Sequence, residues 1–126
     1  MKRIMAISAG LALLAALPSA VLAHGMTKPQ HGGVVQMNGE TLFELVRAPA
    51  GVSLYVIDED EPVAATSMTA KLSITAGGKR REVIMTAGKG NQFFAKGVTL
   101  PAGATVGVQV INNASQARYG TTFTIK

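Results

Sequence analysis

Alternation of apolar and polar residues is the feature that most constrains the fold of this chain. It is clearest in three segments, at residues 70–75, 105–110 and 122–126. Successive side chains of a β-strand point to opposite faces, so alternation predicts strands with one buried and one solvated face. Helical spacing is hard to find after Ala23, so an almost wholly β domain is expected. Its expected buried residues are Leu54, Val56, Leu72, Ile74, Val106, Val108, Phe123 and Ile125.

Turn residues divide the expected strands at short intervals. Asn38-Gly39 separates two apolar runs and is a two-residue hairpin signal, and Gly77-Gly78 separates two more. This spacing predicts about seven or eight short strands, which is typical of an immunoglobulin-like β-sandwich. A small closed β-barrel is the alternative. The chain has no cysteine, so the apolar strand faces must stabilise the domain without disulfides.

The N-terminus has the features of a secretory signal peptide. Two basic residues precede an apolar run from residue 4 to 17, and a cleavage site follows at Ala23. The run is shorter than the ~20 residues of a spanning helix, so no stable membrane insertion is expected after cleavage. The sequence therefore predicts a periplasmic protein. Its expected parts are a signal peptide at 1–23, a flexible arm at 24–33 and a β-sandwich domain at 34–126.

Charge is concentrated in two short runs. Lys79-Arg80-Arg81 follows Gly77-Gly78 and is interpreted as a solvated hairpin tip, to which the sequence assigns no role. Asp58–Glu61 lacks the spaced ligands of a calcium loop and is interpreted as a solvated turn. A nucleic-acid surface would need a wider basic face with interleaved aromatic residues, so no nucleic-acid partner is expected.

The candidate metal ligands lie at the expected new N-terminus. Cleavage after Ala23 would make His24 the first residue, which would then offer an α-amine and an imidazole. A turn at residues 28–31 would bring the imidazole of His31 back toward them. Three nitrogens in this arrangement form a histidine brace, similar to the copper sites of other exported copper proteins. Neutral nitrogen ligands favour Cu²⁺ among first-row divalent ions, and the thioether of Met26 suits Cu⁺.

A second interpretation of the same residues needs no metal. His24 and His31 would then be ordinary polar residues of the arm. The segment His31-Gly32-Gly33 would be present for its turn, and the histidine would be incidental.

Several segments of the chain carry a family resemblance. They are His31–Val35, Phe43–Val46, Gly51–Asp58, Pro62-Val63, Ala70–Leu72, Gly77–Lys79 and Asn91–Gly97. These segments resemble a family of small exported bacterial proteins often found beside heavy-metal efflux systems. They are also similar to the N-terminal β-domain of periplasmic adaptor proteins in heavy-metal efflux pumps. The resemblance implies a β-sandwich and a metal-resistance context, and it supplies no catalytic site.

No enzyme motif stands out in the sequence. Nucleophile-elbow, phosphate-loop and zinc-protease patterns are all missing, so no catalytic residue and no enzymatic activity are predicted. The prediction is a periplasmic copper-binding protein for heavy-metal tolerance or delivery. The alternative is a metal-free interaction module that docks on an envelope or efflux partner.

Overall fold

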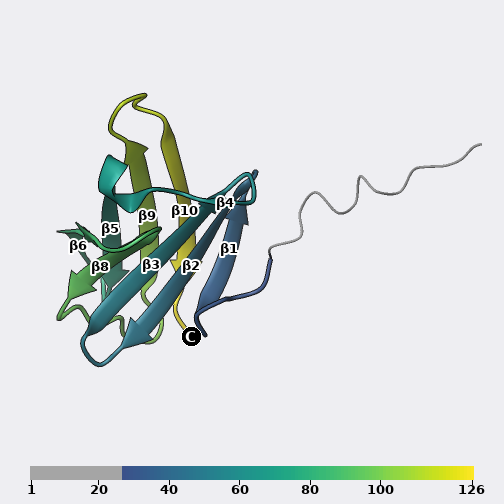
Figure 1. Ribbon diagram of the computed structural model, residues 1–126. Coiled ribbons are helices and arrows are strands. Elements are labelled where there is room, and N and C mark those ends of the chain that lie inside the picture. Colours follow the sequence, from purple (N-terminus) through teal and green to yellow (C-terminus); the bar gives the residue numbers. More distant parts are fainter. Residues whose placement is uncertain (1–26) are drawn as a thin grey trace, which may run out of the picture.

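The computed structural model describes residues 27–126 and folds them into two antiparallel β-sheets (Figure 1). One sheet has the strand order β1-β2-β3-β8-β7, with β4 paired to β3, and the other has the order β10-β9-β5-β6. The strands are β1 (Val34–Asn38), β2 (Thr41–Ala48), β3 (Gly51–Asp58), β4 (Glu61–Pro62), β5 (Met68–Ala76), β6 (Lys79–Ile84), β7 (Thr86–Ala87), β8 (Gln92–Lys96), β9 (Thr105–Asn112) and β10 (Arg118–Thr124). A short 3₁₀ turn, η2 (Ala65–Ser67), precedes β5. The expected signal peptide lies outside the described residues.

The hydrophobic core lies between the two sheets, as the alternation predicts. Phe43 and Leu54 of the first sheet and Leu72 and Val106 of the second are fully buried. All eight residues expected to be buried are buried. The predicted β-sandwich is therefore confirmed, and the alternative of a closed barrel is wrong because the two sheets remain separate. No helix in the described part of the chain is long and apolar enough to cross a membrane.

The hairpin expected after the first strand is present but displaced by one residue. Asn38 is still in β1, opposite Thr41 of β2, so the two loop residues are Gly39 and Glu40. Gly39 has a φ of 62°, a conformation that glycine adopts without strain. The side chain of Asn38 instead donates a 2.6 Å hydrogen bond to the carbonyl of Gly120. This bond joins the edge strand of one sheet to β10 of the other.

Antiparallel pairing places the connections at two opposite ends of the sandwich (Figure 1). One end holds the β2–β3, β5–β6 and β8–β9 connections, and we call it the β2–β3 end. The other holds the β1–β2, β3–β4 and β9–β10 connections, and we call it the β3–β4 end. The directions of the strands therefore place the loops in two groups, one at each end, although members of the two groups follow one another along the sequence.

Candidate functional site

Glu44 is a buried acidic residue at the centre of β2. Its neighbours Phe43 and Leu45 point into the core, so the alternation of the strand turns Glu44 to the outer face of the sheet. Its side chain is nevertheless only 2% exposed. A carboxylate removed from water in this way must be hydrogen-bonded or it destabilises the fold.

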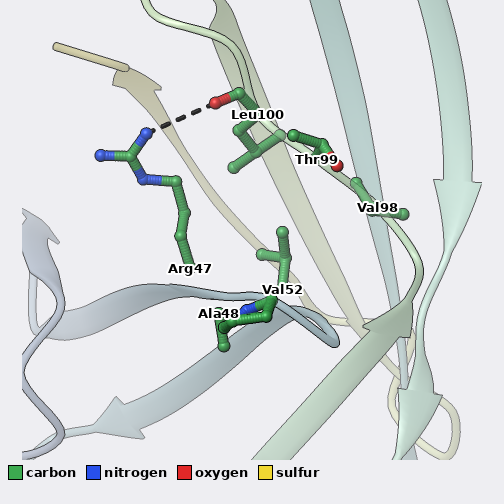
Figure 2. Close-up of a pocket in the computed structure, with 7 residues that line it drawn as sticks. Arg47, Ala48, Val52, Val98, Thr99 and Leu100 are labelled. Atoms are coloured by element: carbon green, nitrogen blue, oxygen red, sulfur yellow. Dashed lines mark hydrogen bonds between the residues drawn. The ribbon is translucent and has the colours of Figure 1, made fainter.

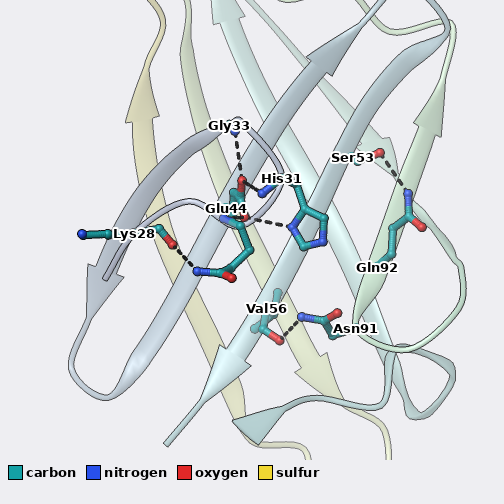
Figure 3. Close-up of polar contacts among 9 residues, drawn as sticks. Lys28, His31, Gly33, Glu44, Ser53, Val56, Asn91 and Gln92 are labelled. Carbon is teal, nitrogen blue, oxygen red and sulfur yellow. Dashed lines mark hydrogen bonds and ion pairs between the residues drawn. The ribbon is translucent and has the colours of Figure 1, made fainter. Parts of the chain in front are cut away.

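Residues 30–33 at the end of the arm fold over this face and supply the hydrogen-bond donors (Figure 3). The backbone N–H of Gln30 donates to Glu44 Oε1 at 2.9 Å. The N–H groups of His31 and Gly33 donate to Oε2 at 2.8 and 2.9 Å. The fourth partner is the imidazole of His31, whose Nδ1 lies 3.0 Å from Oε1. One buried carboxylate thus holds residues 30–33 against the sheet.

Two glycines allow the arm to wrap around the carboxylate. Gly32 has a φ of 75°, in the left-handed region that side chains rarely adopt. Gly33 packs directly on β2, where a Cβ atom would overlap the carbonyl oxygen of Leu45 and the side chain of Val46. The glycine pair after His31 is therefore a requirement of this contact, and the chain bends at residues 30–33.

The electrostatics of the site favour an ionised Glu44. Burial acts to raise the pKa of this carboxyl group. The hydrogen bonds from Gly33 N–H, the His31 ring, Gln30 N–H and His31 N–H act in the opposite direction and prevail. The pKa of Glu44 is therefore lowered below its ordinary value. An ionised carboxylate only accepts hydrogen bonds, so all four of its partners must be donors.

The contact with Glu44 therefore fixes the tautomer of the neutral His31 ring and its orientation. Because Nδ1 donates to Glu44, the neutral ring carries its lone pair on Nε2. The ring also stacks on Tyr55, with 3.5 Å between centroids and an angle of 3° between planes. Tyr55 lies beside Glu44 because the two residues are opposite each other in the β2–β3 ladder. Nothing in the described residues hydrogen-bonds to Nε2, so this nitrogen is available to an external ligand.

Of the predicted metal ligands, only His31 lies within the described residues. His24 and Met26 lie outside them, so the brace stays a prediction. Within residues 27–126, no cluster of three or more histidine, cysteine or acidic side chains could hold a metal ion. His31 therefore offers a single fixed nitrogen, and any metal site needs ligands from elsewhere.

The sequence interpretation missed Glu44 and Tyr55. A signal for Glu44 was available, because a lone charged residue interrupts the apolar run Leu42–Val46. Such a residue in a central strand needs a partner. No comparable signal marks Tyr55, because an aromatic residue in a strand is ordinary.

The fold and the site define a two-sheet β-sandwich with an N-terminal arm held on its outer face by a buried carboxylate. No protein-family model matches the chain, and neither a curated protein nor a solved structure matches it. The resemblance to proteins of heavy-metal efflux therefore stays a prediction, and the function must be argued from the geometry around His31.

Proposed function

We propose that this chain is an exported copper-binding protein that serves heavy-metal tolerance or delivery, with His31 as the fixed metal ligand. The observation that supports this proposal is the 3.0 Å contact between His31 Nδ1 and the buried carboxylate of Glu44. Metal-binding histidines usually donate their second ring N–H to a carboxylate or carbonyl. That bond fixes the tautomer, orients the ring and increases the basicity of the ligating nitrogen.

The other ligands would come from the residues that precede the described arm. After cleavage at Ala23, His24 would contribute its α-amine and its imidazole, and Met26 could add a thioether. Seven residues span up to ~24 Å when extended, so the segment from His24 to His31 is long enough to fold back on Nε2. A set of neutral nitrogens binds Cu²⁺ more tightly than the other first-row divalent ions.

Titration with Cu²⁺ tests the brace. The protein with a free N-terminal His24 is compared with a variant carrying one added glycine before His24, and with His31→Ala. The added glycine keeps every side chain and moves only the α-amine. We expect the affinity for Cu²⁺ to fall at least ~10-fold, about 1.4 kcal/mol, in both variants. The affinity should also weaken under acidic conditions, because protons compete for the same nitrogens.

A second pair of variants tests the part played by the buried carboxylate. Glu44→Gln keeps the shape of the side chain but removes the charge that orients His31. We expect its Cu²⁺ affinity to be about 10- to 100-fold weaker, in proteins shown to be folded by circular dichroism. Glu82→Gln is the matched control, because it removes an exposed carboxylate that does not contact His31. It should leave the Cu²⁺ affinity unchanged.

The outcomes separate the competing interpretations. Equal affinity of the native and glycine-extended proteins would exclude the brace and leave a site built on the two imidazoles. Equal affinity of the native protein and His31→Ala would contradict the proposal altogether. It would favour the metal-free module that docks on an envelope or efflux partner, in which His31 serves only to hold the arm.

A further inference from the structure

Charged side chains are separated between the two ends of the sandwich. The β3–β4 end holds most of the acidic residues, namely Glu40, Asp58, Glu59, Asp60 and Glu61. The β2–β3 end holds the basic residues Arg47, Lys79, Arg80, Arg81, Lys96 and Lys126. Among the described residues, the one acidic side chain near this end is that of Glu82, which follows Arg81 in β6 and contacts Arg80. We refer to it below as the basic end.

The basic residues come together only through the pairing of strands that are distant in the sequence. Lys96, the last residue of β8, is opposite Gly51, the first residue of β3. Lys79, the first residue of β6, is opposite Ala76, the last residue of β5. Both positions adjoin the connections at the same end of the sandwich, and so does Arg47 near the end of β2. The basic end is therefore a surface shared by several separate segments.

Two hollows flank the connection between β8 and β9 at this end. One, of about 290 Å³, lies beside Arg47, whose guanidinium reaches the carbonyl oxygen of Leu100 at 3.4 Å (Figure 2). The other, of about 410 Å³, is lined by Lys79, Arg80 and Arg81 together with Thr99. The surface of the basic end is thus uneven, with cationic side chains at the borders of both hollows.

Several of these cations have no partner in the described part of the protein. Arg80 is engaged, because it contacts Glu82 at 2.9 Å and Ser73 at 2.7 Å. The side chains of Lys79, Arg81 and Lys96 are exposed and make no hydrogen bond or ion pair with any residue from 27 to 126. Their charges are therefore available to an external anion.

We propose that the basic end docks on the surface of a membrane rich in anionic phospholipids and contacts its phosphate headgroups. A planar layer of anions can meet cations from several loops at once, and each basic side chain near such a layer strengthens binding about five-fold. The acidic β3–β4 end is repelled by the same surface, so the charge separation fixes the orientation of the docked protein.

The composition of the basic end favours a peripheral contact with lipid over other anionic partners. Its described loops carry small or neutral residues, such as Pro49, Thr99 and Pro101, and the exposed large apolar side chain nearest to them is that of Val34 at the start of β1. The described loops there also lack the exposed aromatic residues on which nucleic-acid bases stack. Docking should therefore depend mainly on charge and be sensitive to salt.

Co-sedimentation with lipid vesicles tests this proposal. The full chain, as expressing cells process it, is mixed with vesicles of phosphatidylcholine alone or of phosphatidylcholine with phosphatidylglycerol. A triple variant, Lys79→Gln, Arg81→Gln and Lys96→Gln, removes three cations from the basic end. The matched control, Lys28→Gln, Lys89→Gln and Arg118→Gln, removes three exposed cations elsewhere and has the same net charge.

We expect the native protein to bind the anionic vesicles at low salt and to be released at ~0.5 M salt. The basic-end variant should bind about 100-fold more weakly, and the control variant less than about five-fold more weakly. Equal losses in the two variants would overturn the proposal, because net charge alone would then explain the binding. Equal binding of the native protein to both kinds of vesicle would overturn it as well.

A second copy of this chain is the competing occupant, because its acidic end complements the basic end. Such a contact joins different surfaces of the two copies and forms open chains whose size grows with protein concentration. Light scattering detects this growth. If the native protein self-associates at low salt, the triple variant abolishes that association and anionic vesicles are not bound, the membrane proposal is wrong.

Discussion

Two contacts between a carboxylate and a basic side chain are nearly equal in length but have very different surroundings in this molecule. His31 and Glu44 are 3.0 Å apart, and Arg80 and Glu82 are 2.9 Å apart. Glu44 is only 2% exposed, whereas the side chains of Arg80 and Glu82 are 61% and 44% exposed. The length of such a contact therefore does not measure its importance here. The burial of the carboxylate and the number of hydrogen-bond donors around it measure that importance.

The physical reason lies in the alternatives that each carboxylate has. Glu82 can exchange its protein partners for water at little cost, so an exposed pair contributes at most about 1 kcal/mol. Glu44 cannot, because the arm that covers it also supplies its donors. Removing one side of a buried polar contact leaves the other groups without partners, which costs more than the contact itself gains.

The largest expected effect is that of Glu44→Gln. Glutamine keeps the size of the side chain, but its NH₂ group cannot accept the N–H groups that converge on this position. We expect the free energy of unfolding at neutral pH to fall by about 2–4 kcal/mol. Chemical denaturation with urea measures it. A loss below about 0.5 kcal/mol would show that the arm contributes little to the fold.

Gly33→Ala tests the close approach of the arm to β2. The new methyl group would overlap the Leu45 carbonyl, so the arm must move away and its bonds to Glu44 must lengthen. We expect a loss of about 1–3 kcal/mol in the free energy of unfolding. The matched control is Gly107→Ala on β9, where a methyl group would meet only Ser73 at an ordinary 3.7 Å. Similar losses in both variants would contradict the proposed packing.

Acid should lower the free energy of unfolding of the metal-free native protein, and part of this loss should depend on Glu44. The pKa of Glu44 is lower in the folded than in the unfolded chain, so its contribution to stability is present above the unfolded pKa, ~4.3. This contribution is lost as the pH falls through the unfolded and then the folded pKa. Unfolding measured from neutral to strongly acidic pH should therefore show a steeper decline for the native protein than for Glu44→Gln. Parallel curves would mean that Glu44 has the same pKa in both states.

The smallest expected effect is that of Glu82→Gln. This change breaks the exposed pairs with Arg80 and Lys71 on the surface of the second sheet. We expect the free energy of unfolding to change by less than about 0.5 kcal/mol, and added salt to reduce the difference further. A loss comparable with that of Glu44→Gln would show that burial is not what distinguishes the two pairs.

The β class of the fold and the residues of its core follow from the sequence alone. Alternation is a local property, since each residue's face follows from that of its neighbour, and for this reason the expected buried residues are all buried. The hairpin after β1 was located to within one residue. His31, which the sequence singled out as a metal ligand, lies against the buried Glu44. Its binding of a metal and the brace with His24 stay predictions.

The segment that covers the outer face of β2 is visible only in the folded chain. The hydrogen-bond partners of Glu44 lie 11 to 14 positions before it in the chain. These partners precede the strands, so the apolar–polar alternation does not include them. Alternation assigns Glu44 to the solvent side, and it cannot show that the arm lies over that side. The role of Glu44 as an acceptor of four donors therefore emerges only when the chain is folded.

The separation of acidic and basic side chains between the two ends of the sandwich also arises only in the folded chain. The acidic run Asp58–Glu61 and the basic run Lys79–Arg81 are both visible in the sequence, where each is an ordinary polar turn. Their positions at opposite ends depend on the direction and order of the strands between them, which are set by long-range pairing. Local patterns fix which face of a strand is buried, whereas the end of the sandwich at which a loop lies is a property of the whole topology.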